Sequence, residues 1–140
     1  MATESILIDT GAVVALLDTG EEHHQAIRSY LGKRILLPVT LLAEIDYMVS
    51  KYLGDHVARA FFAGMENGDL ELLGFDTTDF ARANAIMARY PDVPLGIADA
   101  SVMALAERYQ IRQILTLDRR HFSLVKPNNM DYFFWLDFTA

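Results

Sequence analysis

Short apolar runs alternate with longer amphipathic segments along the chain, and this alternation restricts the possible folds more than any other feature. The short runs predict strands at Ser5–Asp9, Arg34–Val39, Leu70–Phe75, Gln113–Leu117 and Tyr132–Phe138. The longer segments predict helices at Thr10–Leu17, Glu22–Leu31, Leu41–Leu53, His56–Asn67, Thr78–Tyr90 and Ile97–Tyr109. Strands separated by helices are typical of α/β proteins. We therefore expect a central, mostly parallel, twisted sheet with helices on both faces.

The length and composition of the chain fit one globular domain. A chain of 140 residues can bury a substantial core, and we expect residues 1–140 to form a single domain. Hydrophobic residues make up 52% and charged residues 22% of the chain, which excludes a disordered or fibrous protein. The chain has no cysteine, so disulfides, thiolate nucleophiles and cysteine-ligated metal sites are excluded as well.

No part of the sequence resembles a membrane span or a secretion signal. The longest uncharged apolar stretch is Ile35–Ala43, far shorter than the ~20 residues that a spanning helix needs. The first residues lack a basic region, and Glu4 and Asp9 interrupt any apolar segment of a signal peptide. We therefore expect a cytoplasmic location.

The net charge of the chain limits how it can act on nucleic acid. Twelve Lys and Arg residues against 19 Asp and Glu residues give a formal charge of −7. Proteins that bind nucleic acid passively are usually basic. Two bound divalent cations would reduce the charge from −7 to −3. Any chemistry on nucleic acid by this chain therefore requires metal ions.

Acidic residues end two of the predicted strands. Asp9 follows the apolar run Ile6–Ile8, and Asp118 follows Ile114–Leu117 with its side chain on the same side as that of Thr116. In parallel α/β sheets, ligands bind outside the carboxyl ends of the strands, where both residues would lie. The alternative for each residue is that it caps the helix that follows.

Two further acids belong to predicted helices. Glu44 is one residue too late to form a capping box with Thr40, and it lies at the edge of the apolar face, where a solvated position is the alternative. Asp99 shares the buried face of its helix with Val102, Met103 and Ala106, whereas Ser101 and Arg108 are expected to face solvent. A carboxylate on an apolar face requires a partner.

Together, the four acids predict a metal site. Asp9, Glu44, Asp99 and Asp118 belong to separate segments that begin at the same edge of the predicted sheet. Clustered carboxylates repel one another unless a cation neutralises them. Carboxylate oxygens are hard ligands that suit Mg²⁺ or Mn²⁺, and such a site can activate water for attack on a phosphodiester.

Four stretches in this order resemble one known family. They are Ile6–Leu17 with Asp9, Pro38–Glu44, Gly96–Ser101 with Asp99, and Leu115–Phe122 with Asp118. Their residues and spacing resemble the PIN-domain ribonucleases and, within them, the VapC-type toxins of prokaryotic toxin–antitoxin pairs. The resemblance covers nearly the full chain, and its most specific string is Leu115–Phe122.

The resemblance implies a single PIN-like domain that acts as a Mg²⁺- or Mn²⁺-dependent endoribonuclease. Asp9 and Asp99 would be the main metal ligands, with Glu44 and Asp118 in support, and all four would be catalytic. Thr116 would hydrogen-bond a water or a phosphate oxygen. The products would carry a 3′-hydroxyl and a 5′-phosphate. The resemblance also implies a homodimer and inhibition by a cognate antitoxin protein, although solitary members of the family have other roles.

Basic and aromatic residues add candidate contacts. Arg119, Arg120, His121 and Lys126 follow Asp118 and are candidates for binding the RNA backbone, the alternative being ordinary solvated charges. Phe61 and Phe62 are expected in the core or in a dimer surface, or alternatively in a groove for an antitoxin helix.

Other functions fit the sequence less well. Asp9–Gly11 and Asp18–Gly20 both read Asp-Thr-Gly, as in aspartic proteases, but those enzymes are all-β and the predicted helices contradict that fold. Asp9 has no acidic neighbour, unlike the site of a receiver domain, and glycine-rich nucleotide-binding motifs are absent. The remaining alternative is a catalytically silent PIN fold that binds a protein or RNA partner.

Overall fold

The computed structural model describes residues 5–117, 119–127 and 134–135, and it describes side chains for 5–117 and 122–127. The described helices are α1 (Thr10–Leu17), α2 (His24–Arg28), α3 (Leu42–Leu53), α4 (Asp55–Glu66), α5 (Thr77–Arg89), α6 (Ile97–Tyr109) and α7 (Arg119–Leu124), with a 3₁₀ turn η1 (Val39–Leu41) before α3. The strands are β1 (Ser5–Ile8), β2 (Arg34–Pro38), β3 (Glu71–Leu73), β4 (Gln113–Leu115) and β5 (Phe134–Trp135).

The strands form one sheet in the order β3-β2-β1-β4-β5, and every described pairing is parallel. β1 lies at the centre, where Ile6 pairs with Ile35 of β2 on one side and with Gln113 of β4 on the other. The chain order reverses there, because β2 and β4 leave β1 in opposite directions. A ligand site in an open α/β sheet forms at such a switch point, beyond the carboxyl ends of the strands.

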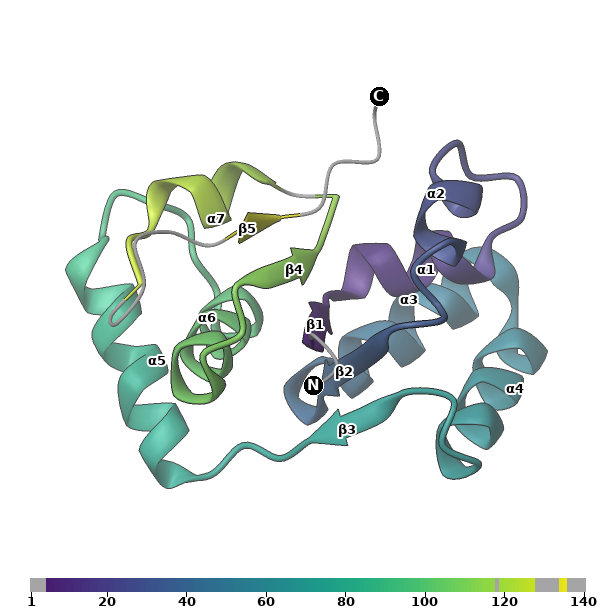
Figure 1. The fold of residues 1–140 in the computed structure, drawn as a ribbon, viewed down its shortest axis with the longest axis horizontal. Coiled ribbons are helices and arrows are strands. Elements are labelled where there is room, and N and C mark those ends of the chain that lie inside the picture. The colour runs from purple at the N-terminus through teal and green to yellow at the C-terminus, as the bar shows by residue number, and fades with distance from the viewer. Residues whose placement is uncertain (1–4, 118, 128–133, 136–140) are drawn as a thin grey trace.

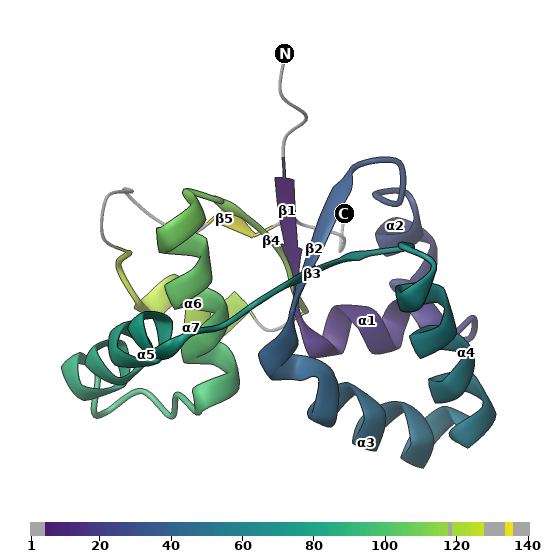
Figure 2. The same cartoon turned by 90° about the horizontal axis from the view of Figure 1, so that it is seen from below.

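Helices cover the sheet on both sides. Figures 1 and 2 both show α1, α2, α3 and α4 to the right of the strands and α5, α6 and α7 to the left. The central strands β1, β2 and β4 are apolar after their first residue, and Ile6, Leu7 and Ile8 have no exposed surface. Such strands are expected where helices pack on both faces of a parallel sheet. The predicted α/β architecture is therefore confirmed.

Two differences from the predicted elements have physical causes. The helix expected at Glu22–Leu31 covers only His24–Arg28, because turns occupy both of its ends. Helix α7 was not predicted, since Arg119–Leu124 is too short to show a helical period. The strand expected at Tyr132–Phe138 is described only at Phe134–Trp135, and the rest of that range lies outside the described residues.

Helix α6 is buried more completely than its sequence pattern suggests. Every residue from Ala100 to Glu107 is buried, including Ser101, which we expected to face solvent. The expectation was wrong because α6 packs between α5 and the sheet, so that it lacks a single solvent face along this stretch. The Ser101 hydroxyl is satisfied in the core by the Ala98 carbonyl oxygen at 2.7 Å.

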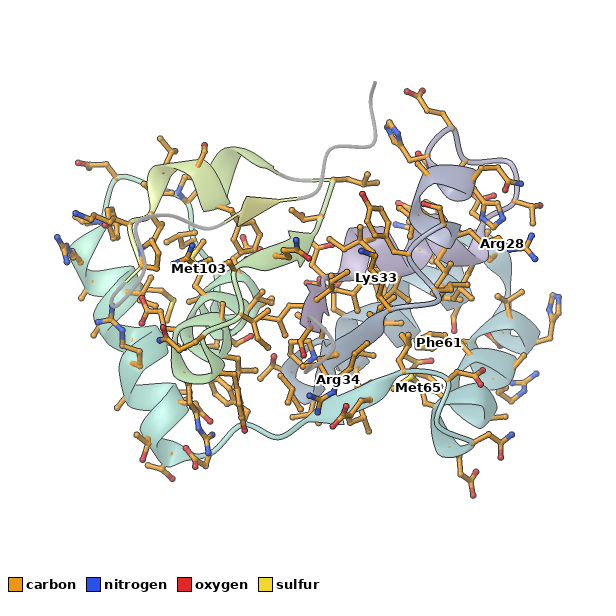
Figure 3. The ribbon with its side chains drawn as sticks, in the orientation of Figure 1. Arg28, Lys33, Arg34, Phe61, Met65 and Met103 are labelled. Carbon is orange, nitrogen blue, oxygen red and sulfur yellow. The ribbon has the colours of Figure 1, made fainter. Side chains whose placement is uncertain are left out.

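Figure 3 shows Phe61 and Met65 on the side of α4 that faces the rest of the molecule. Both residues are half-buried and pack against the core. Phe61 also contacts Phe62 edge to face, with 5.7 Å between ring centroids.

The longest described helices, α5 and α6, have 13 residues. Within the described ranges we find no helix with the length and hydropathy required to cross a bilayer.

Candidate active site at the carboxyl ends of the central strands

Asp9 joins the end of β1 to the start of α1. Its extended backbone ends the strand, and its Oδ1 accepts a hydrogen bond of 3.0 Å from the Ala12 backbone N–H. Asp9 is therefore the N-cap of α1, as the alternative interpretation held. This role uses one carboxylate oxygen, and the side chain still lines the pocket described below. The structural role and a functional role of Asp9 are thus compatible.

Thr116 holds the second carboxylate oxygen of Asp9. The Thr116 hydroxyl donates a hydrogen bond to Asp9 Oδ2, and the Asp9 backbone N–H donates to the Leu115 carbonyl oxygen at 3.2 Å. Thr116 is completely buried. Its hydroxyl faces Asp9 in this structure, and the expected hydrogen bond of Thr116 to a water or a phosphate oxygen stays a prediction. Its contact orients the carboxylate.

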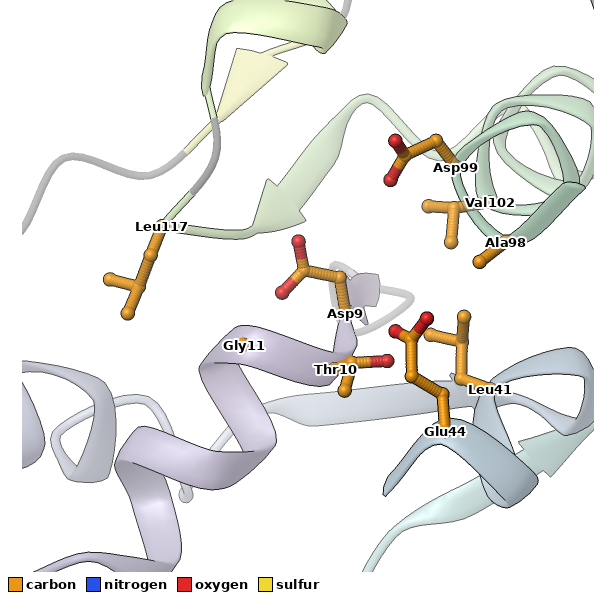
Figure 4. A pocket seen from close by; sticks show the side chains of 9 residues that line it. All are labelled: Asp9, Thr10, Gly11, Leu41, Glu44, Ala98, Asp99, Val102 and Leu117. Atoms are coloured by element: carbon orange, nitrogen blue, oxygen red, sulfur yellow. The ribbon is translucent and has the colours of Figure 1, made fainter. Parts of the chain in front are cut away.

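Glu44 enters the site from the first turn of α3. Pro38 ends β2, η1 redirects the chain, and α3 begins at Leu42 without a side-chain cap. Thr40 and Glu44 therefore do not form a capping box. This agrees with the spacing in the sequence, in which Glu44 is one residue too late. Glu44 is exposed on α3, and Figure 4 shows its carboxylate directed toward Asp9.

Asp99 lies in the first turn of α6 and is half-buried. Gly96 is the N-cap of α6, so Asp99 does not cap it. A hydrogen bond of 2.6 Å between the hydroxyls of Thr40 and Ser101 joins η1 to α6. This contact fixes the starts of α3 and α6 against each other, which brings Glu44 and Asp99 to opposite sides of one opening.

The three described carboxylates line a single pocket of about 290 Å³. Figure 4 shows the carboxylates of Asp9, Glu44 and Asp99 around this space. The lining residues are Asp9, Thr10, Gly11, Leu41, Glu44, Ala98, Asp99, Val102 and Leu117. No basic side chain is among these described lining residues, so the lining carries negative charge only. The topology therefore brings together three of the four acids that the sequence singled out.

The chemistry of this lining suits a hard divalent cation. Mg²⁺ is usually held by one or two carboxylates and keeps several waters. Asp9 and Asp99 would be sufficient direct ligands, with Glu44 reaching a water. Within the described ranges, no three His, Asp or Glu side chains converge closely enough to form a complete ligand set. The lining thus fits a cation that is bound partly through water rather than one enclosed by protein.

Most of the remaining predicted residues fall where side chains are not described. Asp118 lies outside the described residues. Arg119, Arg120 and His121 form the first half of α7, which follows β4, and the structure describes only their backbone. Lys126 is exposed, and its backbone N–H donates to the Tyr90 hydroxyl at 3.0 Å. The roles of these residues stay predictions.

Sequence reasoning missed Thr10 as a lining residue. Its hydroxyl oxygen is buried and has no hydrogen-bond partner among the described residues. The signal was present in the sequence, since Thr10 follows the terminal acid of a buried strand. Thr10 was part of the stretch that resembles the family and of an apparent protease motif, which the α/β fold excludes, but it was given no role of its own.

Residues 6–126 match the model of the PIN domain family. The chain therefore belongs to the PIN domain family, and the resemblance to its VapC-type members is confirmed. A curated relative, Ribonuclease VapC26 of Mycobacterium tuberculosis, is 35% identical over 125 residues, which are 87% of this chain and 93% of the relative.

Solved structures share the fold at lower identity. The Sarcin-Ricin loop cleaving toxin VapC20 of Mycobacterium tuberculosis superposes with a TM-score of 0.75 at 16% identity, covering 83% of this chain and 92% of that chain. The DNA-bound VapBC structure from Salmonella typhimurium gives a TM-score of 0.70 at 19% identity, covering 96% and 98%. These likenesses show that the chain shares its fold with these structures.

Proposed function

We propose that this protein is a Mg²⁺- or Mn²⁺-dependent endoribonuclease and the toxin of a toxin–antitoxin pair. The observation that carries the proposal is the pocket in which Asp9, Glu44 and Asp99 meet at the switch point of the sheet. The name of the relative, a ribonuclease at 35% identity, supports RNA as the substrate. A toxin–antitoxin complex from Klebsiella pneumoniae that shares the fold supports a protein inhibitor.

The residues of the pocket have distinct roles in the proposed reaction. Asp9 and Asp99 would hold the cation, with Glu44 and Asp118 in support. When bound, such a cation neutralises charge at the phosphate and makes water a stronger nucleophile. Thr116 keeps the Asp9 carboxylate in one orientation through its hydrogen bond. Hydrolysis would leave a 3′-hydroxyl and a 5′-phosphate.

Arg119, Arg120 and His121 would bind the RNA backbone from α7. These residues directly follow Asp118, and they would supply positive charge next to a pocket that has only acidic charges in its described lining. With a net charge of −7, the protein would depend on such local cations and on the metal to bind a polyanion.

A second surface would bind the antitoxin. A largely apolar groove of about 450 Å³ lies between α1, α4 and the start of β3, and Phe61 is part of its lining. Asp69 is the one charged residue among its described lining residues. An amphipathic antitoxin helix with a basic residue would fit this groove. The substitution Ala60→Arg at its exposed rim would then block inhibition without changing RNA cleavage.

The test is cleavage of total tRNA and rRNA by the purified protein in Mg²⁺, in Mn²⁺ and in EDTA. We expect cutting with either cation, none with EDTA, and 5′-phosphate ends on the products. If the protein binds Mn²⁺ in calorimetry but cuts no RNA, the ribonuclease proposal fails for these substrates. If it neither cuts RNA nor binds a divalent cation, the catalytically silent binding module becomes the better account.

A further inference from the structure

The Thr10 hydroxyl is a buried polar group at the carboxylate pocket, and it has no partner among the residues that the structure describes. Thr10 is 7% exposed, and its Oγ1 is one of two buried side-chain atoms that lack a hydrogen-bond partner in the described part of the chain. Figure 4 shows the hydroxyl directed into the pocket toward Glu44. A buried hydroxyl without a partner is unfavourable, so a water or a ligand in the pocket has to satisfy it.

The position of Thr10 removes its usual intrahelical partner. Inside a helix, a threonine hydroxyl commonly bonds the carbonyl oxygen four residues earlier. Thr10 is the first residue of α1, so the residue four positions earlier is Ile6, which lies in β1 and pairs within the sheet. The β-branched side chain also has few rotamers to choose from. Its hydroxyl is therefore held at the pocket by the backbone and not by a polar contact.

Among the described residues that line the pocket, Thr10 carries the one side-chain hydrogen-bond donor. The ionised carboxylates of Asp9, Glu44 and Asp99 only accept hydrogen bonds, and the other lining side chains are apolar or glycine. The oxygens of a phosphodiester also only accept. The Thr10 hydroxyl is therefore the lining side chain that can donate to a phosphate group in this pocket.

We propose that the Thr10 hydroxyl donates a hydrogen bond to a non-bridging phosphate oxygen of the RNA that is cut. This assignment rests on the proposed ribonuclease function and adds a substrate-binding residue to it. The N–H groups at the start of α1 give the same end of the pocket a partial positive charge, which favours an anion there. Thr10 thus binds the phosphate from the side of α1, while the carboxylates serve the cation.

Thr10→Val tests the assignment because it removes the hydroxyl and keeps the shape. The variant should be as stable as the wild type or more stable without metal, since a buried unpartnered hydroxyl is lost. Its affinity for Mn²⁺ in calorimetry should not change. Its single-turnover cleavage rate, and its affinity for a short fluorescent single-stranded RNA in Ca²⁺, should fall about tenfold or more. Thr10→Ser should restore both, and Thr78→Val on the exposed face of α5 should change neither.

Three results would overturn the assignment. Normal cleavage and RNA binding by Thr10→Val would show that the hydroxyl does not bind RNA. A matching loss of Mn²⁺ affinity would show that it serves the cation or its waters instead. A lower melting temperature of the metal-free variant, with Thr10→Ser equally impaired, would make the role structural. These results differ from failure of the proposed function, in which the wild type itself cuts no RNA with any divalent cation.

Discussion

The hydroxyl of Thr116 donates a hydrogen bond to the carboxylate of Asp9, although the two residues lie 107 positions apart in the chain. β1 and β4 are neighbours in the sheet, and Ile8 pairs with Leu115, so that both residues emerge at the same edge. One oxygen of Asp9 caps α1 and the other accepts from Thr116. The orientation of this carboxylate is therefore fixed by the fold before any ligand binds.

Replacing Thr116 with valine should reduce activity and stability together. Thr116→Val keeps the buried shape but removes the donor to Asp9, which should cost about 1–2 kcal/mol of unfolding free energy. Cleavage should fall about tenfold because the carboxylate gains freedom to turn. Urea unfolding and single-turnover cleavage measure the two effects. Thr116→Ser should recover most of both, and cleavage by Thr116→Val at the wild-type rate would contradict the positioning role.

A divalent cation should stabilise the folded protein through the acidic pocket. At a concentration 100-fold above its Kd, a ligand that binds only the folded state adds about 2.7 kcal/mol. We expect Mn²⁺ to raise the melting temperature by roughly 5–10 °C. Asp9→Asn and Asp99→Asn should abolish this rise. Without metal, Asp99→Asn should melt at the wild-type temperature or slightly above, because repulsion between carboxylates is reduced. A clear drop in the metal-free melting temperature of Asp99→Asn would mean that Asp99 is structural.

Acid should weaken the start of α5 through Asp76. The side chain of Asp76 accepts from the Asp79 backbone N–H, and that of Asp79 accepts from the Asp76 N–H, each at 3.0 Å. The hydrogen bond from the Asp79 backbone lowers the pKa of Asp76, and Arg108 adds to this. Because the folded pKa is lowered, the stabilisation is present above the ordinary value of about 3.9 and is lost as the pH falls through the folded pKa.

The variant Asp76→Asn isolates this effect. Asparagine still caps a helix but does not titrate. At neutral pH the wild type should therefore melt at a higher temperature than Asp76→Asn, and the difference should shrink as the pH falls below about 4. Asp46→Asn, an exposed change on α3, controls for the altered net charge. A difference in melting temperature that does not change with pH would contradict the assignment.

The parallel sheet could be predicted from local sequence patterns, and so could the position of three acids at one of its edges. An apolar run that ends in Asp9 indicates a buried strand and its carboxyl end, and Asp99 is the acid on the apolar face of a helix. Parallel topology then brings such positions to one edge without any further information. The pairing of strands was not needed to predict that Asp9, Glu44 and Asp99 meet.

The rest of the site depends on contacts between distant segments. Ser101 was expected in solvent because helical periodicity assumes a helix with one apolar face, whereas α6 is covered on both sides. The burial of Thr116 and the contact between Thr40 and Ser101 follow from how β4, η1 and α6 pack. The unpartnered hydroxyl of Thr10 is visible only once its neighbours are in place. Whether a buried polar side chain has a hydrogen-bond partner depends on how distant segments pack, so the sequence alone does not reveal it.

The most direct test of the central claim compares RNA cleavage by two matched variants. Asp99→Asn removes a carboxylate from the pocket, whereas Asp92→Asn makes the same chemical change at an exposed position outside the pocket lining, shortly before α6. With Mn²⁺, purified side by side, Asp92→Asn should cut RNA at the wild-type rate and Asp99→Asn should show no cutting above background. Equal cleavage by both variants would contradict the account, because the activity would then not depend on the carboxylate pocket.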